Sequence, residues 1–591
     1  MIRLVRTRML LGALALAALT AAGCRRTPEV GAPADRSGAP AIPPRRIADF
    51  PAEWRFTPGR PATFAPSAMV VSNSAIASAA GLEILHRGGN AVDAAVATGF
   101  ALAVTYPVAG NIGGGGFMVI RLADGRVAAI DYREIAPLAA SRNMYLDSSG
   151  QKTNKSLVGH LASGVPGAVA GLTEALAKYG TMPLRDVMAP AIRLATEGFV
   201  VDSAMFRSLR GDSALITRFA GGPTFFPTGG TIQPGALLVQ PDLARTLRLI
   251  ADRGAKGFYE GETAALLVAE MGRGGGIITQ EDLVRYRPIW RTPLRSTYRG
   301  YGVIGMPPAS SGGTTMIEAL NILETYDSLP PFASAGYKHV LAEALRRAFV
   351  DRNTKLCDPA FCTVPVAELT SKEYARTQRQ SIDLTHATRT PRVAEAPGGT
   401  HTTHYSVVDA KGNAVATTTT LNGGYGSGVY VTGAGFFLNN EMDDLAVAPG
   451  KPNMFGLVEG EQNAVQPGKR PLSSMSPTIV LDPRGRVLLV TGAAGGPTII
   501  TGTMQVILNV IDHRMTLADA MAAPRMHHQA WPDSIRFEMN GFAPTVADSL
   551  MAMGHGLMRT GSLTNVNSIM RVRGGWEGVV EPRSAGGAAG Y

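Results

Sequence analysis

Two threonines, Thr402 and Thr420, lie where a hairpin would bring their hydroxyls together. Residues 402–422 read T-T-H-Y-S-V-V-D-A-K-G-N-A-V-A-T-T-T-T-L-N, which predicts two strands joined by a tight turn at Gly412. With Lys411 at the centre of the turn, each threonine lies nine residues away, so their Cβ atoms should be ~4.5–5.5 Å apart. A hydroxyl next to a base can act as a nucleophile. Threonine is also a good strand residue, and the hairpin alone favours that plainer interpretation.

Other reactive motifs are missing from the sequence. There is no G-x-x-x-x-G-K-[ST], no H-E-x-x-H and no G-x-S-x-G. The glycines at 113–116 lead into a predicted strand and not into a helix N-terminus, so a phosphate loop is not expected. His527 and His528 have no third ligand at metal spacing and are expected to be a polar loop pair. We therefore expect neither a cofactor nor a metal.

The composition indicates a folded body that does not bind nucleic acid. Hydrophobic residues make up 45% of the 591 residues and charged residues 17%, which argues against a disordered chain. The net charge is +10, but residues 1–60 hold ten Arg, no Lys and four acids and account for +6 of it. The remaining residues carry +4, too little for a basic stripe along a phosphate backbone.

The N-terminal residues predict export. Three arginines precede an apolar run, Met9–Leu19, which is too short to span a membrane, and small residues lead to Cys24. Residues 1–23 are therefore expected to be a signal peptide, and residues 24–66, rich in Pro, Ala and Arg, a tether. Two interpretations stay open for Cys24: the acylated first residue of an envelope-anchored or periplasmic lipoprotein, or an incidental cysteine in a secreted chain.

The two remaining cysteines are Cys357 and Cys362. In an exported chain a local disulfide between them is plausible, and two free thiols are the alternative.

The order of elements predicts an α+β fold. A short strand at 69–72 is followed by helices at 75–87 and 91–104, the second capped by Asn90. A glycine turn at 110–116 leads to a predicted hairpin of strands 117–122 and 127–132. Residues 165–369 are mainly helical, and β character prevails from Thr402 to about Leu517. Helices packed around sheets fit this order.

Seven stretches spread over residues 66–591 give the sequence a family resemblance. The chain resembles the γ-glutamyltransferases (γ-glutamyl transpeptidases), which are N-terminal-nucleophile hydrolases. The stretches are G-G-N-A-V-D-A-A-V-A at 88–97, G-N-I-G-G-G-G-F at 110–117, D-Y-R-E at 131–134, T-T-H-Y-S-V-V-D at 402–409, L-N-N-E-M-D-D at 438–444, P-L-S-S-M-S-P-T at 471–478 and G-G-P at 495–497.

The resemblance implies a four-layer αββα sandwich made as a precursor. The precursor would cut itself between His401 and Thr402, giving a large subunit, 67–401, and a small catalytic subunit, 402–591, that stay intertwined. Thr402 would then supply both the nucleophilic hydroxyl and, as a new α-amine, the base. An α-amine titrates near ~7.7–8.0, so it can accept a proton at neutral pH. Thr420 would orient the hydroxyl.

The resemblance also assigns the substrate contacts. Arg133, helped by Ser473 and Ser474, would bind the α-carboxylate of a γ-glutamyl group, since a guanidinium can do so with two parallel hydrogen bonds. The ammonium would lie among Asn422, Glu441 and Asp444. Backbone N–H groups of Gly495 and Gly496 would form the oxyanion hole.

Residues 445–456 resemble the lid loop that covers the γ-glutamyl pocket in many bacterial relatives. Phe455 stands where those relatives often carry Tyr, whose hydroxyl can bond the Asn matching Asn422. A phenylalanine lacks that donor, which suggests a lid that opens more readily. The alternative is that the ring only packs.

The sequence leaves three functions to compare. The first is transfer or hydrolysis of γ-glutamyl groups from glutathione and related compounds, with water, an amino acid or a peptide as acceptor. The second is a glutaryl (cephalosporin) acylase of the same fold, whose substrate lacks the ammonium and would not need Glu441 and Asp444 together. The third is a non-catalytic envelope binding protein, which would not need an intact nucleophile.

Overall fold

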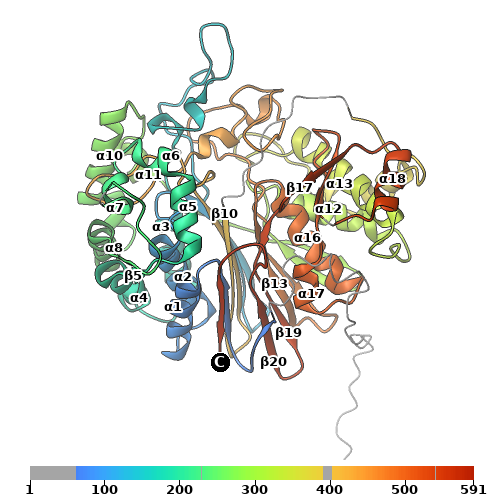
Figure 1. Cartoon of the computed structure of the whole chain (residues 1–591), viewed down its shortest axis with the longest axis horizontal. Helices are drawn as coiled ribbons and strands as arrows, with labels where there is room; N and C mark the ends of the chain where they lie inside the picture. Colours follow the sequence, from blue (N-terminus) through green and yellow to red (C-terminus); the bar gives the residue numbers. More distant parts are fainter. Residues whose placement is uncertain (1–60, 228, 391–401, 540) are drawn as a thin grey trace, which may run out of the picture. The chain divides into compact units, whose positions relative to one another are not determined.

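Two seven-stranded sheets lie face to face between two layers of helices (Figure 1). The computed structural model describes residues 61–227, 229–390, 402–539 and 541–591. His401, Cys24 and the predicted signal peptide lie outside these ranges, as does most of the predicted tether. All strand pairs in both large sheets are antiparallel. The α+β, αββα prediction is confirmed.

The sheet that carries the threonine hairpin is called the β10 sheet. Its strands, in spatial order, are β21 (Gly587–Gly590), β2 (Met69–Ser72), β10 (Thr402–Val408), β11 (Ala414–Thr420), β3 (Gly115–Arg121), β4 (Val127–Asp131) and β7 (Ile289–Arg291).

The facing sheet is called the β13 sheet. Its strands, in spatial order, are β1 (Thr63–Ala65), β20 (Gly575–Val579), β19 (Ser568–Val572), β13 (Val487–Thr491), β12 (Thr478–Leu481), β9 (Tyr301–Gly305) and β8 (Leu294–Tyr298). Short strands outside both sheets are β5 (Phe199–Val200), β6 (Leu237–Leu238), β14 (Ala493–Ala494), β15 (Met526–His527), β16 (Ile535–Glu538), β17 (Leu557–Thr560) and β18 (Asn565–Val566).

Helices cover the outer face of each sheet. Those over the β10 sheet are α1 (Ala75–His86), α2 (Ala91–Thr105) and α3 (Ala168–Tyr179), with α4 (Leu184–Glu197) and α8 (Pro241–Arg253) packed outside them. Those on the β13 side are α12 (Gly312–Glu324), α13 (Ala335–Lys355), α16 (Thr498–Ile511), α17 (Leu517–Ala522) and α18 (Pro544–Ala552). The remaining helices are α5 (Ser203–Gly211), α6 (Ser213–Thr217), α7 (Gly222–Phe225), α9 (Lys256–Tyr259), α10 (Glu262–Gly274), α11 (Gln280–Arg285), α14 (Val366–Leu369) and α15 (Lys372–Gln380).

Side chains alternate between two cores along the central strands. Phe117 and Val119 on β3 point into the core between the sheets, and Met118 and Ile120 point into the core beneath α1 and α2. A strand buried on both faces needs apolar residues at nearly every position, as β3 has. The predicted cap on α2 is present, since the Asn90 side chain accepts backbone N–H groups of the first turn.

The glycine turn predicted at 110–116 is shorter than expected, because β3 already begins at Gly115. Gly115 pairs with Thr420 and Gly116 with Thr419. A Cβ on Gly115 would lie 2.5 Å from the carbonyl oxygen of Tyr132, so only glycine fits between the neighbouring strands. The mainly helical stretch 165–369 likewise contains β7, β8 and β9, which add strands at the edges of the large sheets.

Strands from before and after the predicted cut lie side by side in the β10 sheet. β2 lies between β10 and β21, pairing with Ser406–Val408 on one side and with Gly587–Gly590 on the other. The backbone N–H groups of Ser67 and Ala68 both donate to the carbonyl oxygen of Tyr591, at 2.8 and 3.0 Å.

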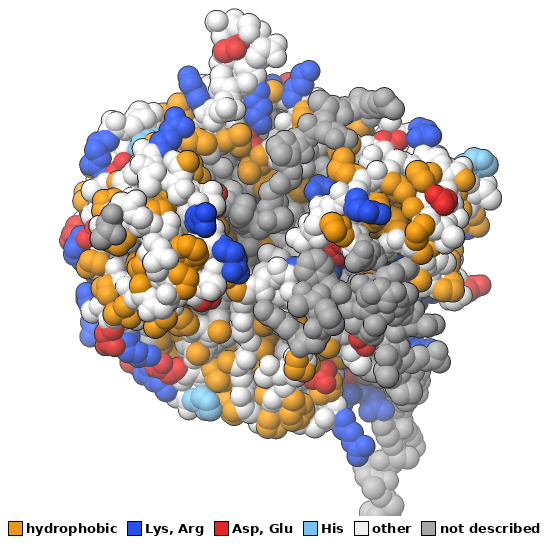
Figure 2. Space-filling model, viewed as in Figure 1, with side chains coloured by type: hydrophobic (Ala, Val, Ile, Leu, Met, Phe, Trp, Pro, Cys, Tyr) orange, Lys and Arg blue, Asp and Glu red, His pale blue; other side chains and the backbone are white. Residues whose placement is uncertain are grey.

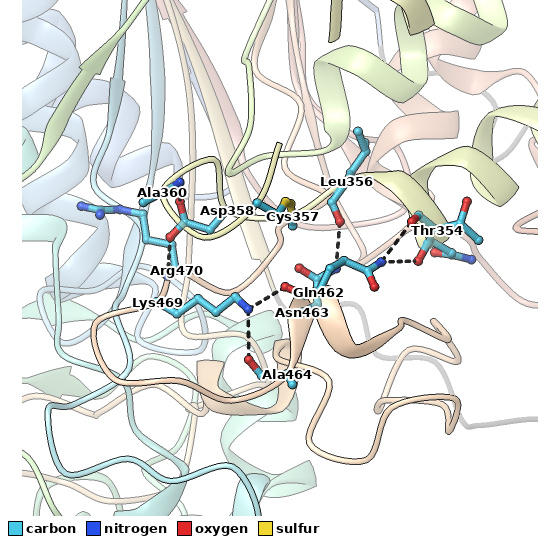
Figure 3. The surroundings of a disulfide bond; sticks show 12 residues. Thr354, Leu356, Cys357, Asp358, Ala360, Gln462, Asn463, Ala464, Lys469 and Arg470 are labelled. Carbon is cyan, nitrogen blue, oxygen red and sulfur yellow. Dashed lines mark hydrogen bonds between the residues drawn. A yellow bond between two sulfur atoms is a disulfide. The ribbon is translucent and has the colours of Figure 1, made fainter. Parts of the chain in front are cut away.

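Cys357 and Cys362 are joined by a disulfide just after α13 (Figure 3). Their Cα atoms are 6.3 Å apart, within the usual range for a disulfide. The loop is fastened to the segment at 462–470: Asn463 Nδ2 donates to the carbonyl of Leu356 at 2.9 Å, and the backbone N–H of Arg470 donates to Asp358 at 2.9 Å. This segment leads directly to Ser473.

Candidate active site

The register of the hairpin places Thr402 opposite Thr420, as predicted. Their Oγ1 atoms are 3.3 Å apart, and Thr402 is 6% exposed at the first position of β10. Thr420 Oγ1 also accepts the backbone N–H of Asn422 at 2.8 Å. Asn422 has a left-handed φ of 75°, which turns the chain so that its side chain can donate to the carbonyl of Asn440 at 3.1 Å.

Two asparagines hold the start of β10 in place. Thr403 Oγ1 donates to Asn73 Oδ1 at 3.0 Å. Asn567 Nδ2 donates to the same Asn73 oxygen at 2.9 Å and to the carbonyl of His404 at 2.8 Å. These contacts connect the start of β10 to residues that lie before and after it in the sequence.

His404 does not compete as a base. Burial lowers the pKa of His404 to about 3, so its imidazole is neutral at physiological pH. Its ring nitrogens lie 2.9 Å from Thr418 Oγ1 and 3.1 Å from Ser406 Oγ, so both are engaged within the sheet core.

Arg133 forms the centre of a buried charge cluster, defined here as Arg133, Glu134, Glu441 and Asp444. Its side chain is 1% exposed. Nη2 donates to Asp444 at 2.7 Å, Nη1 forms an ion pair with Glu441, and Nη1 lies 3.7 Å from Glu134. Glu441 and Asp444 come from one short 3₁₀ helix, η4 (Glu441–Asp444). The group expected to bind a carboxylate thus contacts the groups expected to bind an ammonium.

Three carboxylates share one guanidinium in this cluster. Burial raises the pKa of Glu441 well above its ordinary value and also raises that of Asp444, although Arg133 partly opposes both shifts. Burial raises the pKa of Glu134 to about 7, again against Arg133. One guanidinium does not neutralise three carboxylates, so a further cation would stabilise their ionised forms.

Ser473 and Ser474 lie on the segment that touches Arg133, since Arg133 Nε donates to the carbonyl of Pro471 at 3.1 Å. Ser473 Oγ accepts the backbone N–H of Met475 at 3.1 Å. Ser474 Oγ is buried and has no hydrogen-bond partner among the described residues. A buried hydroxyl without a partner is costly, which fits a group that completes its bonding with a ligand.

Gly495 and Gly496 occupy left-handed conformations just before α16, with φ of 135° and 60°. Their amides lie at the positively polarised end of this helix, where developing negative charge is favoured. A Cβ on Gly496 would lie 2.6 Å from Cδ1 of Phe455, so the Phe455 ring packs directly on this loop.

Asn453 connects the lid loop to the charge cluster. Its Oδ1 accepts the backbone N–H groups of Phe455 and Leu457 at 3.0 and 3.1 Å, and its Nδ2 donates to Asp444 Oδ1 at 3.3 Å. Asn422 Nδ2 reaches the neighbouring Met454 Sδ at 3.6 Å. Phe455, which is 5% exposed, therefore lies between the charge cluster and the loop at Gly495 and Gly496.

Hydrogen bonds thus link Thr402 to Thr420 and Thr420 to Asn422. Ion pairs link Arg133 to Glu441 and Asp444, and Phe455 packs on Gly496. Ser473 and Ser474 join this region through the backbone of Pro471.

Sequence reasoning gave no role to Asn73, Glu134, Asn453 or Asn567. Glu134 belongs to the D-Y-R-E stretch, but only its burial in the structure distinguishes it from an ordinary acidic residue. The prediction of a polar loop pair is wrong for His527, which lies in β15, whereas His528 follows that strand in a loop. Both histidines are fully buried. Among the described residues, no three His, Cys, Asp or Glu side chains are arranged so that they could hold a metal ion.

The chain is similar to known proteins over most of its length. The sequence matches the family model described as Gamma-glutamyltranspeptidase over residues 77–591. It is 46% identical to the glutathione hydrolase proenzyme of Escherichia coli K12, covering 88% of this chain and 91% of that protein. It is 41% identical to the acylase ACY 1 proenzyme of Pseudomonas sp. SE83, again covering 88% and 91%.

A solved structure gives the same architecture. The crystal structure of cephalosporin acylase from Bacillus halodurans superimposes with a TM-score of 0.80 at 29% identity, covering 92% of this chain and 99% of that one. With the family model spanning the hairpin, the charge cluster and the glycine loop, this chain belongs to the γ-glutamyltranspeptidase family.

Proposed function

We propose that the chain is a precursor that cuts itself between His401 and Thr402 and then hydrolyses or transfers γ-glutamyl groups. The observation that carries this proposal is the 3.3 Å contact between the Thr402 and Thr420 hydroxyls at the start of β10. It supplies an oriented nucleophile at the one position where a cut would also create a base.

In the precursor the Thr402 hydroxyl attacks the His401 carbonyl. The peptide C–N bond breaks as the new ester C–O bond forms, and the freed nitrogen of Thr402 takes up the hydroxyl proton. Water then opens the ester, giving the His401 carboxylate and regenerating the hydroxyl. Thr402 is left with a free α-amine.

In the mature enzyme the α-amine accepts the proton of Thr402 Oγ1 as this oxygen attacks the γ-carbonyl carbon. The N–H groups of Gly495 and Gly496 stabilise the oxyanion, a contribution typically worth ~10²–10³ in rate for each donor. The leaving amine takes the proton from the α-amine and departs. Water or an acceptor amine then attacks the γ-glutamyl ester by the same steps.

The charge cluster would recognise the free amino-acid end of the substrate. The substrate carboxylate would join Arg133, Ser473 and Ser474, while its ammonium would lie among Glu441, Asp444 and Asn422. Because Arg133 already contacts Glu441 and Asp444, the zwitterion would rearrange an existing ion-pair network. Its ammonium would balance the excess carboxylates, and its carboxylate would satisfy the Ser474 hydroxyl.

A glutaryl acylase is the second candidate, because an acylase lies among the relatives. A glutaryl group has no ammonium and would leave the three carboxylates facing one guanidinium, so the cluster favours γ-glutamyl substrates. The test compares γ-glutamyl-p-nitroanilide with glutaryl-p-nitroanilide and records intact mass of the same sample. Cleaved protein with a higher kcat/KM for the γ-glutamyl compound supports the proposal. A preference for the glutaryl compound would favour the acylase.

We also propose that the chain is exported, with residues 1–23 as a signal peptide and an acyl anchor on Cys24. The motivation is the Arg-rich start, the short apolar run and the small residues before Cys24. No helix in the described residues is long and apolar enough to cross a membrane. A mass matching diacylated Cys24 at the N-terminus would support the anchor, and an unmodified secreted chain would contradict it.

A further inference from the structure

A basic cavity lies at the end of the sandwich opposite Thr402. Three turns meet there: the β10–β11 turn, the β12–β13 turn and the β19–β20 turn. The cavity has a volume of about 1050 Å³, and its lining includes Lys411, Arg486, Arg571 and Arg573. Arg121 joins this group, since its guanidinium donates to the carbonyl of Gly485 at 3.1 Å. These five cations define the basal cluster.

The acidic residues of the cavity are turned inward. Asp409 accepts the backbone N–H groups of Lys411 and Asn413 at 2.9 and 3.0 Å, and Asp482 accepts those of Arg484 and Arg486 at 2.9 Å each. Both carboxylates are almost fully buried. Asp482 also forms an ion pair with Arg486 at 2.8 Å, and Arg571 packs over the Trp576 ring. The turns present Lys411 and Arg573 to solvent.

The basal cluster carries a net positive charge. The four lining cations against the two lining acids give +2, while residues 61–591 carry +4 in all, from +10 for the chain less +6 for residues 1–60. The cations also repel one another: burial lowers the pKa of Arg571, and Arg486 and Arg121 lower it further. Such a cluster is stabilised by an external anion.

We propose that this surface rests on an anionic phospholipid membrane. Pro66 and Ser67, between the end of β1 and the start of β2, line the cavity, so the N-terminal part of the described chain passes along this face. Residues 1–60 carry +6 and cannot neutralise the cluster themselves. In Figure 2, Lys and Arg side chains stand at the lower edge of the view, below the strands labelled β19 and β20 in Figure 1. Phosphate headgroups supply the missing negative charge.

The test uses the chain from Arg25 onward, so that neither the apolar run nor an acyl group contributes. Residues 41–591 form one compact unit, so removing residues 1–24 leaves the folded body whole. The protein is sedimented with vesicles of phosphatidylcholine and phosphatidylglycerol at 3:1 and with phosphatidylcholine alone, in 50 mM salt. We expect binding to the anionic vesicles. Replacing two exposed cations, Lys411→Gln with Arg573→Gln, should weaken it about 25-fold, at about fivefold per charge.

The matched control is Arg207→Gln with Arg210→Gln, which removes the same charge from exposed positions on α5 and should change binding less than twofold. Hydrolysis of γ-glutamyl-p-nitroanilide checks that every variant is folded. Equal losses in the two double variants, or equal binding to both vesicle types, would overturn the proposal. Release by 10 mM inorganic phosphate at constant ionic strength would also overturn it, since it would indicate a site for small anions.

Discussion

The hairpin of β10 and β11 and the charge cluster hold their key side chains, Thr402 and Arg133, by different kinds of contact. The hairpin positions Thr402 through a continuous ladder of seven residue pairs. Neutral hydrogen bonds next to it, from Thr403 to Asn73 and from Asn567 to the carbonyl of His404, hold the start of the strand. The cluster sets Arg133 through ion pairs with side chains from a loop and a 3₁₀ helix, and it stays rich in carboxylates.

The difference follows from what each region must do. A nucleophile that attacks first its own chain and then a substrate needs one fixed place, which a central strand provides. A recognition site must be more stable with substrate bound than without it. Buried carboxylates that lack a cation destabilise the site when no substrate is bound. Substitutions in the hairpin should therefore abolish chemistry, and substitutions in the cluster should change affinity and pH dependence.

The largest effect is expected for the hairpin. Thr402→Ala removes the hydroxyl, so the chain should remain a single uncut and inactive species. The parent should yield a small chain of 190 residues (591 − 401). Thr402→Ser should be cut slowly, and Thr403→Ser, a control one position along, should be cut normally. Denaturing gels with intact mass measure this, and a fully active but uncut parent would defeat the mechanism.

Glu134→Gln tests whether ionisation of Glu134 lowers the free energy of unfolding. The folded pKa of about 7 lies above the ordinary 4.5, so the folded state holds its proton more tightly. The parent should lose ~3 kcal/mol of unfolding free energy as pH rises from about 4.5 to about 7. Glu134→Gln should lack this loss. Denaturant unfolding at pH 4.5, 6 and 8 measures it, with the exposed Glu281→Gln as control. Parallel pH profiles for Glu134→Gln and the parent would refute the assignment.

Arg133→Lys separates bidentate recognition from simple charge. Lysine keeps the charge but cannot offer two parallel N–H donors, so ~1.5–3 kcal/mol of binding should be lost, raising KM about 10–150-fold. Steady-state kinetics with a γ-glutamyl anilide measure this, and Arg142→Lys on the surface is the control. A KM within twofold of the parent would show that Arg133 does not hold the substrate.

The disulfide should matter for stability more than for chemistry. Closing the short loop at 357–362 should contribute about 2 kcal/mol to the free energy of unfolding. The double variant Cys357→Ser with Cys362→Ser should lose that amount while its KM stays near the parent value, because the contacts of Asn463 and Arg470 remain. Unchanged stability would indicate that the two thiols are not paired in the folded protein.

The smallest effect is expected at the lid. Phe455→Tyr adds a hydroxyl donor, which the resemblance to bacterial relatives directs at Asn422. Such a bond should slow deacylation about 2- to 12-fold, the equivalent of ~0.5–1.5 kcal/mol. Stopped-flow measurement of acyl-enzyme breakdown, in water and with glycylglycine, reports this step, and an unchanged acylation rate serves as the control. Identical breakdown rates would mean that the ring only packs against Gly496.

The hairpin was predictable from sequence because its geometry is local. A two-residue period and one glycine turn fix which residues face each other, and the observed register agreed. The boundary of β3 was misplaced because glycine usually signals a turn, whereas Gly115 and Gly116 are required by the close approach of neighbouring strands.

The charge cluster was predictable only as a set of residues. The motifs named Arg133, Glu441 and Asp444, but their mutual contacts depend on how η4 packs against the end of β4. Burial likewise distinguishes Glu134 from an ordinary acid, and Asn453 gains its role only when the lid folds back onto Asp444. The buried position of His527 and His528 also comes from tertiary packing, which overrides the polarity of their side chains.

The position of β2 between β10 and β21 has a consequence for the order of the folding reaction. The precursor folds as one molecule, so its folding rate should not depend on concentration. Once the chain is cut, β2 belongs to one polypeptide and both flanking strands belong to the other. Refolding of the mature enzyme then requires two molecules to meet, and its rate should rise with protein concentration. Folding of the uncut precursor would therefore be unimolecular and reversible. After self-cleavage, refolding would need two chains to meet, so dilution would prevent it.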